Sequence, residues 1–428
     1  MTNLEIAPES DMGLSIKVPS ASWLYYLSLG MFLTFAVVII YLVAMVGTRQ
    51  YSLLAPYIPL MLVAIIISLA GFLVITVRNA GWRIFVSGAF LLPLMISIGG
   101  ISIHRTIWRE MDARDEDIYY TFKEGERLMQ GQNLYERILS SDMRTNDKYA
   151  TYLPLFYHLA NWTQSLGLEH FARWLLFWRE IFLIFNIAVG ALLFYVPYKK
   201  GMIILAIFAN LFWLFNRWTL SATISADFDF IPMFFFILGL IFFPYRLWVS
   251  GLLIGLSLSL KHFGIFIIPL LLIYLWQTKP LKKVLIYSFS IIVIPCIVSL
   301  PFLLSNWKAF ILSILFSATR YPFSSLRIDS VDALLGWVGI PAKLLMLGLL
   351  GLLYALAVGS KNHLYLLSLL VMSVFVFFNS VFYPDYVMYL VPFIALAASE
   401  VLKIWKPEVS LDSASNKLRE KYFEWRAR

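Results

Sequence analysis

Long runs of hydrophobic residues, separated by short polar segments, dominate the sequence. The first three runs cover residues 23–46, 56–77 and 84–103, and none of them contains a charged residue. Each has about the length that an α-helix needs to cross a hydrocarbon core of about 30 Å. Backbone polar groups inside lipid need internal partners, and the runs lack the alternation of a membrane barrel. We therefore expect transmembrane helices.

Nine more hydrophobic runs follow, at about 171–195, 201–217, 227–244, 246–260, 262–276, 284–304, 336–358, 362–380 and 386–402. Together they predict an all-α polytopic membrane protein with about twelve transmembrane helices. The stretch 246–276 is expected to form two short helices, each about 22 Å long, interrupted near Lys261. A single helix there would place the C-terminal tail on the opposite side of the membrane.

The composition agrees with a membrane protein and indicates which partners to expect. Of 428 residues, 61% are hydrophobic and 14% are charged, whereas a soluble domain has roughly a quarter charged residues. The formal charge of +9 would suit nucleic acid, but its distribution indicates membrane topology, so we expect membrane lipids and no nucleic acid. Residues 1–22 do not resemble a cleavable signal peptide. The single Cys296 forms no internal disulfide.

The charged residues predict which loops face the cytoplasm. With a cytoplasmic N-terminus, the short inner loops carry no acids, and the tail beyond residue 402 has seven bases against four acids. Such a Lys/Arg excess is typical of cytoplasmic segments. The large loop 104–170 has eleven acids and eight bases and is expected outside. The inner-loop bases are Arg78, Arg83, Lys199, Lys200, Arg246, Lys279, Lys282, Lys283 and Lys361.

The chain is interpreted as one domain with five segments. These are a cytoplasmic N-terminal segment 1–22, two additional helices in 23–81, a core 82–305 that includes the outer loop 104–170, a C-terminal transmembrane region 306–402 and a basic tail 403–428. The outer loop is expected to carry short interfacial helices, because aromatic, aliphatic and polar residues interleave between Tyr152 and Leu168. We call residues 104–170 the excursion.

The excursion holds the first candidate site, an acidic run that includes Asp112, Asp115 and Asp117 and is followed by Tyr119. Carboxylates just outside a bilayer can deprotonate an incoming hydroxyl or hold a divalent ion against a phosphate. A solvated polar loop is the alternative interpretation.

Asp227 and Asp229 form the second acidic site, at the predicted outer end of a span. Carboxylates beside a hydrophobic span are costly and usually functional. Capping of the helix by Asp227 is the alternative, but it would leave Asp229 unexplained.

Lys261 and His262, at the predicted helix interruption, would suit a phosphate group. The alternative is a lysine that snorkels toward water and merely marks a helix end.

Arg320 and Arg327 lie in a predicted second outer loop, 305–335, where they would clamp a diphosphate or bind lipid headgroups. Asp385 is the only acid in the last outer turn. Tyr386 and Tyr389 beside it would stack on a sugar or, more commonly, anchor the chain at the interface.

The ordered motifs resemble the GT-C superfamily of polyprenyl-phosphate-sugar-dependent glycosyltransferases. The similarity is closest to bacterial polyprenol-phosphate-mannose-dependent alpha-mannosyltransferases and weaker to the catalytic subunit of GPI mannosyltransferase I. It covers residues 82–305 best. The segments that carry it are 115–120 (DEDIYY), 131–136 (GQNLYE), 149–155 (YATYLPL) and the glycine-containing run 250–257 that leads to Lys261.

The resemblance implies a GT-C fold with a catalytic outer loop. Asp115 matches the essential aspartate of the family, its expected base, and Asp117 matches the second acid, although the spacing also permits Asp112. Lys261, Arg320 and Arg327 would fall where the family holds the donor's phosphate. With the candidates from the residue patterns, the predicted substrate site consists of Asp112, Tyr119, Tyr152, Asp227, Asp229, Lys261, His262, Arg320, Arg327 and Asp385. Asp115 and Asp117 would also hold a divalent cation, Mg²⁺ or Mn²⁺, if one is used.

These inferences predict an enzyme that moves a hexose, with mannose the first choice, from a polyprenyl-phosphate donor to a lipid-linked or cell-envelope glycan. We expect it in a bacterial inner membrane with its active site facing outward. Two alternatives stay open. One is an envelope polysaccharide polymerase or ligase, and the other is a lipid or solute transporter, in which internal repeats and helices broken near the midplane are typical.

Overall fold

The structure, a computed structural model, describes residues 116–140, 150–200, 202–319, 330–336, 340–360, 363–378 and 384–405. All secondary structure in these ranges is helical, including short 3₁₀ segments labelled η. The elements are α4 (Asp117–Met129), η3 (Glu136–Ser140), α5 (Leu155–Ser165), α6 (Phe171–Lys199), α7 (Ile203–Phe215), α8 (Arg217–Ser225), α9 (Phe230–Phe242), α10 (Leu247–Leu260), η4 (His262–Ile267), α11 (Ile268–Thr278), α12 (Leu281–Thr319), α13 (Val331–Leu334), α14 (Ile340–Gly359), α15 (Leu364–Phe377), η5 (Pro384–Tyr389) and α16 (Leu390–Trp405).

Three of the described helical segments are long and apolar enough to cross a membrane: Phe171–Lys199, Leu281–Phe316 and Asp385–Leu402. Shorter apolar helices pack beside them, among them α9, α10 and α15. This architecture is consistent with a membrane protein. The predicted runs 23–46, 56–77 and 84–103 lie outside the described residues, so the count of twelve spans stays a prediction.

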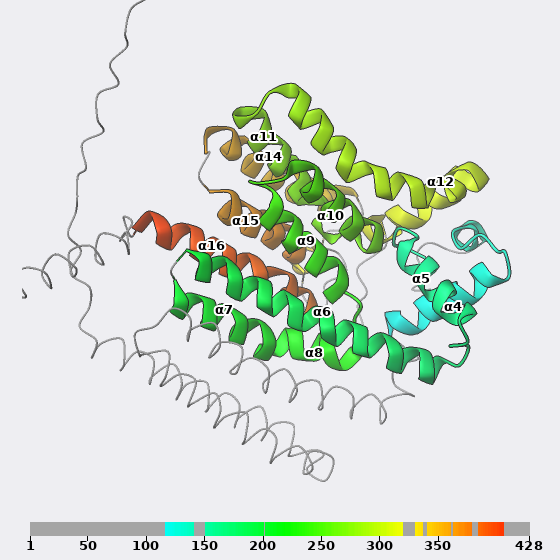
Figure 1. Ribbon diagram of the computed structural model, residues 1–428. Helices are drawn as coiled ribbons and strands as arrows, with labels where there is room; N and C mark the ends of the chain where they lie inside the picture. The colour runs from blue at the N-terminus through cyan, green and yellow to red at the C-terminus, as the bar shows by residue number, and fades with distance from the viewer. Residues whose placement is uncertain are drawn as a thin grey trace, which may run out of the picture.

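The described helices form a bundle, and the described part of the excursion lies at one end of it. In Figure 1, α6, α7 and α16 run together along the bundle, and α4 and α5 lie at the right-hand end. At the opposite end, Lys200 at the end of α6 donates to the Ser399 hydroxyl of α16 at 3.0 Å. The ammonium of Lys199 lies 5.1 Å from the Tyr245 ring, just before α10. These lysines, predicted to face the cytoplasm, therefore gather away from the excursion.

The predicted interruption at Lys261 is confirmed. α10 ends at Leu260, Lys261 is extended with φ −154° and ψ 127°, and the 3₁₀ segment η4 follows. Gly251 of α10 lies against Tyr287 and Ser290 of α12, and Gly255 lies against Ile291. This register makes α10 and α12 parallel. The chain must therefore turn back between them, and η4 with α11 forms the returning segment.

The glycines of α10 allow its close approach to α12. A Cβ at Gly255 would collide with the backbone carbonyl of Ile291, and one at Gly251 would lie 2.7 Å from Ser290 Cβ. Small residues spaced four apart are a common way for membrane helices to pack closely. This contact fixes the end of α10, and with it the position of Lys261.

Substitution of Gly255 by alanine is expected to destabilise the protein by about 1–3 kcal/mol, because backbone atoms must move to admit the methyl group. Gly351→Ala in α14 is the matched control, since nothing lies within 4 Å of its added Cβ. Helix propensity alone should make that control neutral or about 1 kcal/mol more stable. Thermal unfolding of the purified protein in detergent measures both. Equal melting temperatures for the two variants would contradict the proposed packing.

The first half of the predicted outer loop 305–335 is helical. α12 continues to Thr319 beyond a break at Asn306, whose backbone is non-helical and whose side chain accepts from the Ala309 N–H at 3.1 Å. Phe302, Phe310 and Phe316 of α12 pack with Tyr135 and neighbouring apolar residues of the excursion. Helix formation continues here because the excursion covers this part of α12. Between the predicted runs 201–217 and 227–244 the chain forms the short helix α8, capped by Asn216.

Candidate functional site

An ion pair is buried where α9 and α10 meet. The Lys261 ammonium contacts Asp229 Oδ1, and both side chains are largely hidden from solvent, 10% and 5% exposed. The Tyr389 hydroxyl of η5 donates to Asp229 Oδ2 at 2.5 Å. Both oxygens of Asp229 therefore have partners. The snorkelling interpretation of Lys261 is wrong, because its ammonium points into the protein and not to water.

Aromatic rings enclose the Lys261 ammonium. It lies 4.9 Å from the centroid of Phe228, 5.1 Å from Tyr152, 5.8 Å from Tyr389 and 5.9 Å from Tyr386. Ring faces attract cations, more strongly where water is excluded. The rings come from three separate segments of the chain, so Lys261 joins them into one cluster.

The excursion contributes Asp117 to this cluster. Asp117 lies in the first turn of α4, is half-buried, and its Oδ2 accepts a hydrogen bond from the Tyr152 hydroxyl at 3.3 Å. Its charge also acts on Lys261 and on Asp227. The predicted convergence of the acidic run with Lys261 is therefore present for Asp117. Asp112 and Asp115 lie outside the described residues.

Asp227 and Asp229 occupy the tight turn between α8 and α9. Ala226 ends α8 in the left-handed conformation, with φ 59° and ψ 44°, and is the one non-glycine residue with positive φ among the residues that the structure describes. Such strain in L-residues is typical of functional sites. Asp229 holds the N-cap position of α9 but makes no side-chain capping bond. Helix capping by Asp227 is therefore wrong as an explanation of this pair.

Asp385 joins the same end of the bundle through η5. Its carboxylate accepts a hydrogen bond from the Ser221 side chain of α8, and the charges of Asp229 and Arg217 act on it. Asp227 is in turn influenced by Asp385. Asp117, Asp227, Asp229 and Asp385 thus share one neighbourhood, which we call the acidic cluster. Within the described residues, Lys261 is the ammonium at its centre, and Arg217 is an exposed cation at its edge.

Two further predicted site residues lie in different surroundings. His262 is half-buried, and its ring centroid lies 6.0 Å from that of Tyr152, so it borders the cluster. Tyr119 packs edge-on against Phe171 at 5.0 Å. It is two residues from Asp117, so it projects about 200° away around the helix, and we remove it from the candidate site. Arg320 and Arg327 lie outside the described residues.

Sequence reasoning missed several residues of the cluster. Tyr389 was interpreted as an interface anchor or a sugar platform, but it is buried and bonded to Asp229. Phe228, between the two aspartates, stacks on Phe156 with centroids 4.5 Å apart. The sequence feature that could have identified Phe228 is its position between Asp227 and Asp229. Arg217 was not identified, because an arginine at the end of the predicted span 201–217 is an ordinary feature of a membrane helix.

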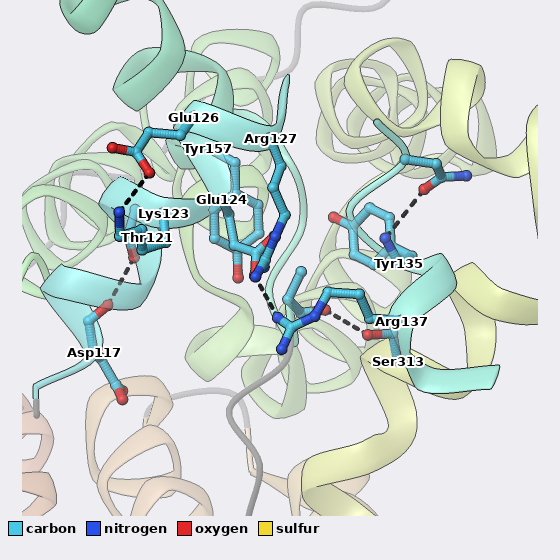
Figure 2. Close-up of polar contacts among 12 residues, drawn as sticks. Asp117, Thr121, Lys123, Glu124, Glu126, Arg127, Tyr135, Arg137, Tyr157 and Ser313 are labelled. Atoms are coloured by element: carbon cyan, nitrogen blue, oxygen red, sulfur yellow. Dashed lines mark hydrogen bonds and ion pairs between the residues drawn. The ribbon is translucent and has the colours of Figure 1, made fainter. Parts of the chain in front are cut away.

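A buried carboxylate fixes α4 within the excursion. Glu124 is 2% exposed and forms ion pairs with Arg127 one turn later and with Arg137 of η3, the latter at 2.9 Å. Figure 2 shows Arg137 reaching Glu124 from η3, with Asp117 at the start of the same helix. Burial raises the pKa of Glu124, and the two arginines offset this only in part. The ion pairs hold α4, and therefore Asp117, against η3.

Glu124→Gln is expected to lower the stability of the excursion by about 1–3 kcal/mol, because two charge-assisted bonds to a buried acceptor are lost. Glu126→Gln is the matched control, since the Lys123–Glu126 pair at 2.7 Å is partly exposed. Exposed pairs contribute about 0–1 kcal/mol. Limited proteolysis of the excursion measures the difference. Equal cleavage rates for the two variants would show that Glu124 does not fix α4.

No group of three or more His, Cys, Asp or Glu side chains is arranged to hold a metal ion within the described ranges. Asp115, one of the two ligands that the resemblance implies, lies outside those ranges, so the divalent cation stays a prediction. No protein-family model matches the chain, and no curated protein matches it.

Proposed function

We propose that the protein is a membrane glycosyltransferase that moves a hexose, with mannose the first choice, from a polyprenyl-phosphate donor to a lipid-linked or cell-envelope glycan. One observation carries the proposal. Asp117, from the acidic run of the excursion, lies beside Lys261 at the end of the bundle opposite Lys199 and Lys200. In a membrane this arrangement would place carboxylates at the outer water–lipid boundary, where a lipid-linked sugar and its acceptor would meet.

The reaction is a single displacement. An acceptor hydroxyl oxygen forms the new bond to the anomeric carbon while the bond from that carbon to the donor phosphate oxygen breaks. The phosphate leaves with the electron pair, and the hydroxyl proton goes to a carboxylate of the acidic run. Asp115 is the base that the resemblance implies, and Asp117 supports it. Attack opposite the leaving group inverts the anomeric centre.

The leaving phosphate needs more positive charge than Lys261 can supply. The Lys261 charge is already matched by Asp229, and three further carboxylates lie in the same cluster. Arg217, exposed at the edge of the cluster, is the described residue best placed to add positive charge. We propose Arg320 or Arg327 as a second cation. Preorganised charges of this kind stabilise a leaving group strongly where water is excluded.

Transfer from radiolabelled polyprenyl-phosphate mannose to total membrane lipid and glycan tests this function. The purified protein should label a product, and Arg217→Gln should weaken donor use, whereas Lys308→Gln, an exposed lysine on α12, should not. Polyprenyl-phosphate glucose and galactose identify the sugar. Absence of transfer from all three donors, with protein that is folded and membrane-inserted, would exclude the proposal.

A proton-coupled transporter is the second candidate, and one observation favours it. The Asp229–Lys261 ion pair is buried at a helix interruption, and ionisable residues at broken helices are typical of transport sites. Reconstitution in liposomes with an internal pH-sensitive dye separates the candidates. A transporter would couple proton movement to a solute gradient, whereas the transferase would leave the internal pH unchanged.

A further inference from the structure

Tyr152 is held unusually firmly for a residue between helices. Its backbone carbonyl accepts a hydrogen bond from the Tyr135 hydroxyl at 2.8 Å, and its backbone N–H donates to the Tyr157 hydroxyl at 3.4 Å. Tyr135 and Tyr157 are both buried in the excursion. Two phenol groups thus hold the backbone of Tyr152 through its carbonyl and its N–H, which limits how far its side chain can move away from the cluster.

The Tyr152 side chain touches both halves of the candidate site. Its hydroxyl donates to Asp117 Oδ2 at 3.3 Å. Its ring lies 5.1 Å from the Lys261 ammonium and packs edge-on against Phe228 at 5.4 Å. Burial, followed by the negative charge of Asp117, raises the pKa of Tyr152, so its hydroxyl keeps its proton and remains a donor.

We propose that Tyr152 is a positioning residue, which holds the Asp117 carboxylate toward Lys261 and links the excursion to the helical core. This role differs from stacking on a sugar, because both the ring and the hydroxyl already have partners within the protein. The inference rests on the proposed function only for its effect on turnover. The contact itself is a property of the folded chain and has its own test.

The Asp117 carboxylate lies among several charged and titratable groups. Lys261 faces it from the end of α10, and Asp227 faces it from the turn before α9. Asp229, Tyr157 and Tyr386 also act on Tyr152. To these charges the Tyr152 hydroxyl adds a hydrogen bond, and hydrogen bonds depend strongly on angle and distance. Loss of the hydroxyl should therefore loosen the placement of Asp117 and weaken the contact between the excursion and the helical core.

A double-mutant cycle tests the contact without any assumption about function. Tyr152→Phe, which keeps the ring, and Asp117→Ala are compared singly and together by thermal unfolding of the purified protein in detergent. If the hydroxyl and the carboxylate interact, the double variant should lose clearly less melting temperature than the sum of the two single losses. Tyr119→Phe is the matched control, because its ring packs on Phe171, and its loss should add to that of Asp117→Ala.

Additive losses in the Tyr152→Phe/Asp117→Ala pair would overturn the proposal. Equal coupling between Tyr119→Phe and Asp117→Ala would also overturn it, because the effect would then be structural and not specific to Tyr152.

Kinetics supply the catalytic consequence. With polyprenyl-phosphate mannose as donor, Tyr152→Phe should lower kcat by about tenfold or more, because Asp117 is less well placed, while KM changes little. Tyr119→Phe should keep the wild-type kcat and KM. If Tyr152→Phe keeps the wild-type kcat although the double-mutant cycle shows coupling, Tyr152 does not position a carboxylate that acts in the reaction. If the wild type transfers no sugar, the proposed function fails, but the double-mutant cycle still decides whether Tyr152 holds Asp117.

Discussion

Substitution of Asn for Asp115 or Asp117 is expected to lower sugar transfer by about 10²–10⁴-fold in each case. Loss of a general base costs a factor of this size, and loss of one preorganised electrostatic partner costs about 10²–10³-fold. The rate of product formation from labelled polyprenyl-phosphate mannose, measured at saturating donor, gives the effect. The amide keeps the shape of each side chain, so the folded state should persist.

Glu126→Gln is the control for these two variants, because Glu126 lies on α4 but pairs with the partly exposed Lys123. It should transfer sugar at the wild-type rate. Full activity in both Asp115→Asn and Asp117→Asn would remove the acidic run from the mechanism. A tenfold or smaller loss in Asp115→Asn, with a large loss in Asp117→Asn, would instead identify Asp117 as the base.

Lys261→Met is expected to destabilise the protein by about 3–5 kcal/mol, because it leaves the buried Asp229 carboxylate without its counter-charge. The double variant Lys261→Met/Asp229→Asn should recover much of this loss, since no unpaired charge remains. Thermal unfolding of the purified protein in detergent compares the single and double variants. Lys308→Met, which removes an exposed lysine of α12, should melt like the wild type.

Additive losses in the double variant would show that Lys261 and Asp229 do not interact. That outcome would also contradict the enclosure of Lys261 by aromatic rings, because the same geometry places the ammonium against both the carboxylate and the rings.

Hydrophobic periodicity and charge predicted the long apolar helices well. They did not predict helical residues whose stability depends on contacts with a distant part of the chain. The predicted helices at 171–195 and 246–260 correspond to α6 and α10, because continuous apolar runs leave helices as the only solution in lipid. The predicted interruption at Lys261 depended on counting charges in loops and on the parity of the spans. By contrast, the helical turns after Asn306 depend on contacts with the excursion, which local sequence does not encode.

Sequence predicted which residues belong to the candidate site, but not which of them form pairs with one another. Lys261, Asp229 and Asp117 were identified because a charged residue beside an apolar segment is energetically costly and is therefore usually functional. Sequence gave no means to learn that Asp229 neutralises Lys261, since the two lie on different helices. The cation expected to hold a phosphate is therefore already occupied. Tyr389 was assigned to the interface or to sugar stacking, because tyrosines near span ends commonly anchor the interface, and its bond to Asp229 was not predicted.

Two-sided cysteine labelling tests the central claim most directly, namely that the excursion and the acidic cluster lie at the membrane face opposite the lysine-rich loops. In a Cys296→Ser background, single cysteines replace Gln132 of the excursion and Thr278 at the end of α11, both exposed positions. With a membrane-impermeant maleimide on intact cells, Gln132→Cys should react at once, and Thr278→Cys should react only after permeabilisation. Reaction of both from the same side would contradict the topology, and with it the proposed outward-facing site.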